Sequence, residues 1–308
     1  MNDAQKTPPD IDCTVIGDAM IDVVLPLTDV HDIASLAEGG VTNTRRRLFA
    51  GGAANIAYYV KKLGGSSAFI GRVGDDYFGK LFLDDLQRNG ITTNVAIDTG
   101  ANTGTVFVLV FRNGQRFFID DRGANASLRH KDIDLGIIKR SRSLCFLGYS
   151  YQDEGFMDCI EKVLDEAPED TAVVFNPGAP NLAARYRTAF TDVIRKHVSV
   201  LILNEAEARK LTQRGSEKEM LDSLLAITDT VALTKGEQGS IVATRDEVYE
   251  IKTTAVKPLD TTGAGDAYAA GLIYGLSRNR GLREAGEFAS GIAGSVVTHF
   301  GARADSLD

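Results

Sequence analysis

The chain of 308 residues is 44% hydrophobic, enough for a large core in one domain or in two unequal domains. Its formal net charge of −8 argues against a nucleic acid as the main partner. No run approaches the roughly 18 consecutive apolar residues of a membrane span, and the opening stretch MNDAQKTPPDID lacks the apolar segment of a signal peptide. We therefore expect a cytoplasmic enzyme that binds no membrane, with Cys13, Cys145 and Cys159 reduced and structural.

The N-terminal part predicts a disordered tail at residues 1–11, an apolar strand, and a second extended run after a break at Gly17. Both runs lie in CTVIGDAMIDVVLPL, with the alternation typical of strands. Asp18 and Asp22 follow the first strand, where an open α/β sheet binds its ligands, so both are candidate site residues. Asp18 could equally cap a turn.

Two β-α units are expected next. GGAANIAYYVKKLGG predicts a helix that ends at Gly64, with Asn55 in its first turn. The Asn55 amide could bind substrate hydroxyls or simply cap the helix. SAFIGRVG reads as a strand, and FGKLFLDDLQRNG as a helix that ends at Gly90.

Between Thr103 and Asp120 the pattern predicts a β-hairpin, because two apolar runs flank the dipeptide Asn113-Gly114. A hairpin has no place inside a parallel β-α alternation. We expect a small separate sheet from about 22–48 and 96–122, able to close over a site as a lid. Its exposed face could instead pair two chains in a homodimer.

The alternation of strand and helix then resumes and predicts a mainly parallel sheet with helices on both faces. The stretches NPGAP (176–180) and NEAEA (204–208) each follow a strand directly, at the ligand-binding end. TVALTKGEQGSIVATRDEVYEI predicts three more strands. The expected segments are helix 132–141, strand 143–147, helix 153–166, strand 172–175, helix 182–196, strand 198–203 and a last helix at 283–300.

The stretch DTTGAGD, Asp260 to Asp266, concentrates the features that phosphoryl transfer to a hydroxyl needs. Gly263 and Gly265 allow a tight turn, and the helix that begins at Ala264 directs its positive dipole end toward the same point, which favours an anion. Asp266 would then accept the proton of the hydroxyl. An ordinary helix start explains the heptapeptide equally well.

Neither GxxxxGK[ST] nor GxGxxG occurs. The stretch GGAANIA with Gly64 and Gly74 downstream, together with DTTGAGDAYAAGLI, resembles the two signatures of the ribokinase-like, phosphofructokinase-B type carbohydrate kinases. The resemblance spans residues 12–305 and includes GANA, NPGAP, NEAEA and TKGEQGS in order. It implies a three-layer α/β/α fold with a small β-sheet lid. It also implies ATP-dependent phosphorylation of a primary hydroxyl of a sugar or nucleoside, with Mg²⁺.

The resemblance also implies roles for single residues. Asp266 takes the position of the catalytic base, and the anion-hole N–H groups come from Gly263, Ala264 and Gly265. The expected substrate residues are Met20, Asp22, Gly51, Gly52, Asn55, Arg122 and Asn125. The expected ATP residues are Asn204, Thr234, Gly236 and Gly239, with Glu207 organising Mg²⁺ through water.

A monovalent cation, potassium, is implied in members of the family that need one. Its ligands would come from Asp260, Thr262 and carbonyl groups near Gly301, although Asp305 departs from the small hydroxyl residue expected there.

Two other functions stay open. A sugar-phosphate or sugar-acid kinase of the same family would use Arg112, Arg116 and Arg122 to hold the anionic group. A regulator that binds adenine nucleotides without turnover would not need Asp266. Within the first function, the thioether of Met20 suits a nucleoside base, whereas GANA and NPGAP resemble ribokinase.

Overall fold

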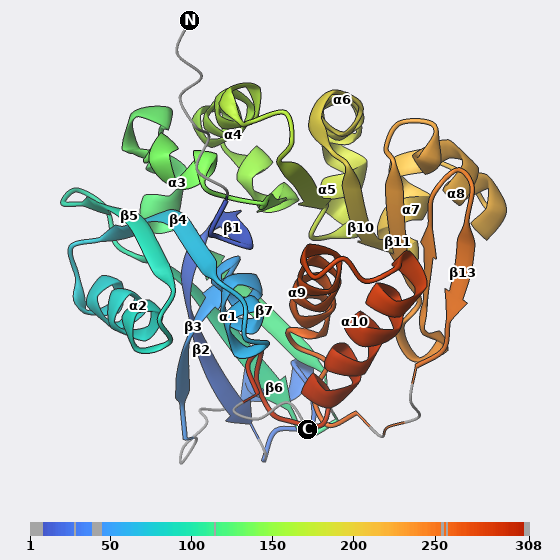
Figure 1. Cartoon of the computed structure of the whole chain (residues 1–308). Helices are drawn as coiled ribbons and strands as arrows, with labels where there is room; N and C mark the ends of the chain where they lie inside the picture. The colour runs from blue at the N-terminus through green and yellow to red at the C-terminus, as the bar shows by residue number, and fades with distance from the viewer. Residues whose placement is uncertain are drawn as a thin grey trace, which may run out of the picture.

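A large sheet of nine strands and a small sheet of four strands organise the computed structural model (Figure 1). The structure describes residues 9–27, 29–38, 45–113, 115–253, 256 and 258–304. Within them the large sheet has the order β13-β12-β11-β10-β9-β8-β1-β4-β5. Its strands are β1 (Cys13–Ile16), β4 (Ser67–Gly74), β5 (Thr92–Asp98), β8 (Ser143–Leu147), β9 (Ala172–Asn176), β10 (Val200–Asn204), β11 (Thr230–Thr234), β12 (Ser240–Ala243) and β13 (Val248–Ile251).

The central strands are apolar on both faces because helices cover both sides of the sheet. In β8, Leu144 and Phe146 enter one core while Cys145 and Leu147 enter the other, as the alternation of side chains along a strand requires. All neighbouring strands from β11 to β5 run parallel, and only β12 and β13 are antiparallel. The expected mainly parallel sheet is confirmed.

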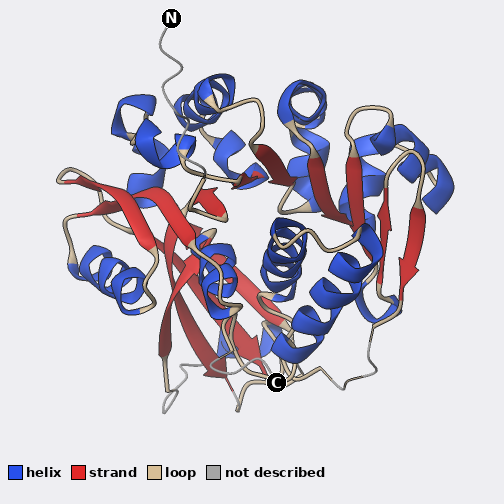
Figure 2. Cartoon of the chain, viewed as in Figure 1, coloured by secondary structure: helices blue, strands red, loops and turns tan. Residues whose placement is uncertain are grey.

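The helices form the two outer layers (Figure 2). One core lies between the sheet and α3 to α8, and the other between the sheet and α1, α2, α9 and α10. The chain is thus a three-layer α/β/α structure, as predicted. The helices are α1 (Ala54–Lys62), α2 (Tyr77–Arg88), α3 (Leu135–Lys139), α4 (Glu154–Glu166), α5 (Pro180–Arg185), α6 (Arg187–His197), α7 (Glu205–Thr212), α8 (Glu217–Leu225), α9 (Ala264–Ser277) and α10 (Leu282–Val296).

The small sheet lies beside the layers, next to α1 and the start of α9 (Figure 1). Its order is β3-β2-β6-β7, with β2 and β6 parallel and both outer pairs antiparallel. The predicted hairpin is present, although Gly114 of its turn lies outside the described residues. The strands are β2 (Ala19–Leu27), β3 (Arg47–Gly52), β6 (Gly104–Phe111) and β7 (Arg116–Asp121).

Some predicted boundaries were wrong. Residues 96–98 belong to β5 of the large sheet, which pairs with β4, so the hairpin half of the small sheet begins at Gly104. The helix expected at 182–196 is broken at Tyr186, whose backbone leaves the helical region. The last helix ends at Val296 rather than near 300. Beyond it the N–H groups of Thr298 and His299 donate to carbonyls three residues back, which is a tighter turn than the α-helix.

The remaining expectations concern the ends of helices and the tail. The predicted helix end at Gly64 is confirmed, since this glycine has φ +87° just after α1. Of the predicted tail, residues 1–8 lie outside the described residues, whereas Ile11 forms a β-bridge with Ser141. No helix of the described part of the chain is both long and apolar enough to cross a membrane.

The strand order reverses direction between β1 and β8, and this reversal places the site. From β1 the sheet grows outward to β4 and β5, and from β8 it grows the other way to β9, β10 and β11. The loops that leave β1 and β8 therefore diverge to opposite faces and open a crevice at the carboxyl ends of the strands.

Candidate active site

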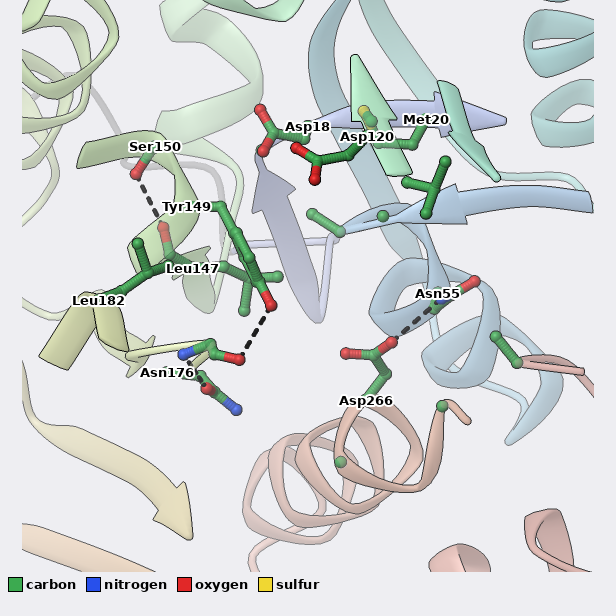
Figure 3. A pocket seen from close by; sticks show the side chains of 18 of the residues that line it. Asp18, Met20, Asn55, Asp120, Leu147, Tyr149, Ser150, Asn176, Leu182 and Asp266 are labelled. Carbon is green, nitrogen blue, oxygen red and sulfur yellow. Dashed lines mark hydrogen bonds between the residues drawn. The ribbon is translucent and has the colours of Figure 1, made fainter. Parts of the chain in front are cut away.

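A cleft of about 520 Å³ occupies this crevice. It is lined by residues that follow five neighbouring strands, by the start of α9, and by Val106, Phe118 and Asp120 of the small sheet. Figure 3 labels Asp18, Asn55, Asp120 and Asp266 among them. Most of the predicted site residues line it. These are Met20, Asp22, Gly52, Asn55, Arg122, Asn204, Glu207, Thr234, Thr262, Gly263, Gly265 and Asp266.

Asp266 lies in the first turn of α9 and faces Asn55 of α1 (Figure 3). The Asn55 Nδ2 donates to Oδ2 of Asp266 over 3.0 Å. Burial raises the pKa of Asp266 to about 6, although the hydrogen bond from Asn55 and the charge of Arg303 lower it. The carboxylate is therefore ionised at neutral pH and a stronger base than a solvated Asp.

Arg303 fixes the orientation of Asn55, and sequence reasoning did not find it. Its Nε donates to Oδ1 of Asn55 over 2.9 Å, so the Asn55 NH₂ group must point to Asp266. The guanidinium is buried, pairs with Asp85, and lies 4.5 Å from the ring centroid of Tyr58. No periodicity or motif marks an arginine in this position, because its partners lie in α1 and α2.

The start of α9 has the geometry of an anion-binding turn. Gly263 takes the N-cap position with φ +78°, and no side chain caps the helix, so the first N–H groups are not satisfied by a side chain. A Cβ on Gly263 would lie 2.2 Å from the carbonyl oxygen of Ala302, whereas a Cβ on Gly265 would meet no atom within 4 Å. Gly263 is thus required by the backbone, and Gly265 leaves an open approach to the helix end.

Asp22 of β2, one of the expected substrate residues, lines the cleft together with Met20 and Gly52. Burial raises the pKa of Asp22 to about 7, the charge of Arg303 opposes this, and the charge of Asp266 adds to it. Gly51 of β3 does not line the cleft, but it is needed there, because a Cβ would lie 2.3 Å from Oδ2 of Asp22. Gly52 has φ +61° and approaches the carbonyl of Asp18.

The neighbours of Asp22 divide into groups that face the cleft and groups that support it. Arg122 lines the cleft and donates to Oδ1 of Asp18 over 2.8 Å. Asn125 is 1% exposed and does not line the cleft; its amide bonds both backbone groups of Ala19, over 2.7 and 3.1 Å. Asn125 also donates to Sδ of Met20, which is 5% exposed. Asn125 thus holds the start of β2 in place without lining the cleft.

The opposite end of the cleft is formed by the loops after β10 and β11. Asn204 and Glu207 form a capping box, with the Asn204 N–H donating to Oε2 of Glu207 over 3.0 Å. Burial raises the pKa of Glu207 to about 6, against the hydrogen bonds from Asn204. Thr234 lines the cleft, whereas Gly236 (φ +60°) and Gly239 (φ +90°) shape the turn behind it.

Within the described residues, no three His, Cys, Asp or Glu side chains converge on a metal position. Mg²⁺ in nucleotide sites keeps several waters and is bound through one or two carboxylates and the phosphates. Glu207, which lines the cleft while only Oε2 enters the capping box, fits such an indirect role.

Two of the residues expected to hold a monovalent cation, Asp260 and Thr262, are in contact with an arginine instead. Asp260 is 5% exposed and accepts hydrogen bonds from the backbone N–H groups of Thr262 (2.8 Å) and Gly301 (2.9 Å). The guanidinium of Arg116 in β7 donates to Oδ1 of Asp260 and to Oγ1 of Thr262. Asp305 lies outside the described residues.

Several cleft residues carry no sequence signal of their own. Tyr149 follows β8, and its hydroxyl donates to the carbonyl of Gly178 over 3.0 Å. Asp120, labelled in Figure 3, and Phe118 come from β7. Of the two further arginines considered for an anionic substrate, Arg112 is exposed and Arg116 is bound to Asp260, and neither lines the cleft.

A carboxylate with a raised pKa beside an uncapped helix start, in the crevice of an open α/β sheet, suits phosphoryl transfer to a hydroxyl. The fold and the site define a kinase of small alcohols. A family model described as pfkB family carbohydrate kinase matches residues 10–308, and the chain belongs to this family. It is an ATP-dependent kinase of sugars or nucleosides, so the alternative of a regulator without turnover is not supported.

Known proteins of this kind resemble the chain along most of its length. Fructokinase-2 of Oryza sativa subsp. japonica is 29% identical over 307 residues, which cover 93% of this chain and 88% of that protein. The crystal structure of adenosine kinase from Sinorhizobium meliloti has a TM-score of 0.88 at 25% identity and covers 97% of each chain. A putative ribokinase II from E. coli, solved with ATP and Mg²⁺, shares the fold with a TM-score of 0.83 at 20% identity, covering 95% of this chain and 94% of that one.

Proposed function

We propose that the enzyme phosphorylates a primary hydroxyl of a neutral sugar or nucleoside, with Asp266 as the general base. The observation that carries this proposal is the Asn55–Asp266 hydrogen bond at the uncapped start of α9. The hydroxyl oxygen forms a bond to the γ-phosphorus, the bond to the ADP oxygen breaks, and the hydroxyl proton passes to Asp266. The N–H groups of Gly263, Ala264 and Gly265 stabilise the charge on the transferred group.

The charges of the cleft support an uncharged substrate. Its lining residues in the described chain include five acids and one cationic side chain, Arg122, which already pairs with Asp18. A substrate phosphate or carboxylate would meet Asp22 and Asp120 without a free cation to compensate. Hydroxyl groups, in contrast, can donate to these carboxylates, with Gly51 and Gly52 allowing close approach. The sugar-phosphate or sugar-acid alternative is thereby disfavoured.

The choice between a sugar and a nucleoside rests on Met20. Its sulfur accepts from Asn125 and only 5% of the residue is exposed, so it has little surface to offer a base. Together with the fructokinase relative, this favours a free sugar. A free hexose is the first substrate to test, and a nucleoside the second.

ATP and Mg²⁺ are assigned to the other end of the cleft. Asn204 and Thr234, at the ends of β10 and β11, face the nucleotide, and the turn with Gly236 and Gly239 contacts it. Glu207 would organise the water shell of Mg²⁺, which neutralises the phosphates when bound. The ATP and Mg²⁺ complex of the E. coli neighbour supports these two cofactors.

The small sheet is proposed to act as a lid, and its outer face as a dimer contact. Phe118 and Asp120 face the cleft, whereas Phe107 and Ile119 pair on the other face, 41% and 54% exposed. The use of ATP and the three buried, free cysteines support a cytoplasmic location.

ADP release over a panel of free sugars, nucleosides, sugar phosphates and sugar acids tests the function. We expect turnover with a neutral member of the panel, and a loss of about 10² to 10⁴ in kcat for Asp266→Asn, the range usual for a general base. Calorimetry with ATP should show that this variant still binds nucleotide. Turnover only with an anionic substrate would overturn the assignment, as would a variant that keeps more than about a tenth of kcat.

A further inference from the structure

An arginine of the small sheet reaches the turn that precedes α9. Arg116 begins β7, and its two terminal nitrogens donate to Oδ1 of Asp260 and, over 2.5 Å, to Oγ1 of Thr262. These partners lie 144 and 146 positions away in sequence. Arg116 is on the same face of the strand as Phe118 and Asp120, which line the cleft.

The two oxygens bound by Arg116 belong to Asp260 and Thr262, two of the residues that the family resemblance assigns to a potassium ion. The Arg116 and Asp260 side chains are 20% and 6% exposed, so solvent screens their charges little. A potassium ion at Oδ1 of Asp260 would lie against the guanidinium, and the two positive charges would repel each other strongly. The residues present therefore do not fit the ion while Arg116 is bound.

We propose that Arg116 takes the place of the monovalent cation, so that turnover does not depend on potassium; this inference rests on the proposed kinase function. Its guanidinium carries a positive charge and a planar set of donors that matches a carboxylate. It neutralises Asp260, which would otherwise direct a negative charge toward the turn that binds the phosphoryl group. Arg116 is a positioning residue, because it acts through Asp260 and Thr262.

The exchange of an ion for a side chain also couples two parts of the enzyme. Asp260 holds the N–H groups of Thr262 and Gly301 on either side of the anion-binding turn. Arg116 connects this turn to β7, so the small sheet and the phosphate site are ordered together. A soluble ion would leave the sheet independent of the turn.

The test compares the wild type with Arg116→Ala and Arg116→Lys in potassium, sodium and choline chloride at equal ionic strength. The wild type should show the same kcat and KM in all three salts. Arg116→Ala should lose at least about tenfold in kcat in choline, since one electrostatic contact beside the reacting phosphoryl group is removed. Potassium should restore most of this loss, because the vacated oxygens can then bind the ion. Arg116→Lys should keep most of the activity without potassium.

Arg140→Ala is the matched control. Arg140 also pairs with an aspartate, Asp10, but both side chains are more than half exposed and lie away from the cleft. This variant should behave as the wild type in every salt. Thermal melts of each variant in each salt separate loss of folding from loss of turnover.

Potassium activation of the wild type would overturn the proposal. So would an Arg116→Ala variant with normal turnover in choline, or one that stays inactive in potassium although folded. If the wild type phosphorylated nothing, the proposed function would fail, and thallium(I) NMR would still decide this inference. Thallium(I), a potassium analogue, should bind Arg116→Ala and not the wild type; the reverse would contradict the proposal.

Discussion

Two half-buried carboxyl groups, Asp22 and Asp266, line the cleft, and their raised pKa values affect activity and stability differently. For activity, the relevant group is Asp266, which must be ionised to act as the proposed general base. For stability, the larger change is at Asp22, whose pKa rises from 3.8 to about 7 on folding. Both effects follow from desolvation of a charge.

We predict that kcat/KM for the substrate increases with pH through about 6, the pKa of Asp266, and levels off above it. Below this pH the base carries a proton and cannot accept another. Initial rates across the pH range test this, with circular dichroism at each pH as a control for folding. Rates independent of pH from about 5 to 8 would mean that Asp266 does not act as a base.

Asp22→Asn is predicted to raise the melting temperature above neutral pH. The folded protein holds the Asp22 proton up to about pH 7, whereas the unfolded chain releases it near 3.8, so this group stabilises the fold at low pH and loses that contribution as pH rises to about 7. The variant should melt a few degrees higher than wild type near pH 8, at roughly 2–4 °C per kcal/mol, with the difference vanishing near about pH 4.

Asp76→Asn is a control for which the expected change in melting temperature has the opposite sign. Burial opposes the shift, but hydrogen bonds from Thr103 and Gly79 lower the pKa of Asp76, so this variant should melt below wild type above neutral pH. Calorimetric melts at two pH values suffice. A lower melting temperature for Asp22→Asn at about pH 8 would show that Asp22 makes stabilising contacts as a carboxylate.

At the scale of elements, the start of α9 contains two glycines with different expected roles. Gly263 is required by the backbone conformation, and Gly265 is expected to keep the approach to the helix N–H groups open. Gly263→Ala forces φ +78° on a residue with a Cβ, directed against the carbonyl of Ala302, and should lower the melting temperature. Gly265→Ala has open space and should stabilise the helix by roughly 0.5–1 kcal/mol. Its methyl group nevertheless narrows the approach to the N–H groups, so kcat/KM for ATP should decrease.

Melting curves and ATP kinetics of the two variants separate these effects. An unchanged kcat/KM for ATP in Gly265→Ala would place the phosphates away from the start of α9. A Gly263→Ala variant as stable as wild type would contradict the backbone argument.

The small sheet is predicted to exchange its backbone hydrogens more slowly when substrate is bound. An open crevice admits water, and a kinase must keep water from the phosphoryl group. Hydrogen exchange of β2, β3, β6 and β7 with and without substrate tests this, with β13 at the far edge of the large sheet as the internal control. Equal protection in both states would make the small sheet a static contact.

At the scale of the whole molecule, we predict a homodimer through the outer face of the small sheet. Phe107, Phe117 and Ile119 lie together on this face and are 41%, 42% and 54% exposed. Single apolar residues on a surface are common, whereas a group of adjacent ones often marks an interaction site. Light scattering should show a dimer that Phe107→Glu with Ile119→Glu dissociates. Val248→Glu, at a residue that is 60% exposed on β13, is the control. A monomeric wild type would contradict this prediction.

The sequence by itself determined most of the secondary structure and several residues of the cleft. Periodic apolar residues identified most strands and helices, and glycine turns placed Gly64 and Gly263 correctly. Asp22, Asn55 and Asp266 carry signals in their own neighbourhoods, and the structure brings all three to one cleft. Such features depend on residues only a few positions apart, and a sequence displays them directly.

Only the tertiary structure decided which distant groups meet. Arg303 binds Asn55 across 248 positions, and Arg116 binds Asp260 across 144. Asn125 was expected to touch the substrate, but its amide is used by the backbone of Ala19. The desolvation that raises the pKa of Asp266 likewise arises only when segments distant in sequence form the cleft around it. A linear pattern contains no distance between strands, so it cannot show which charges are paired or which carboxylates are desolvated.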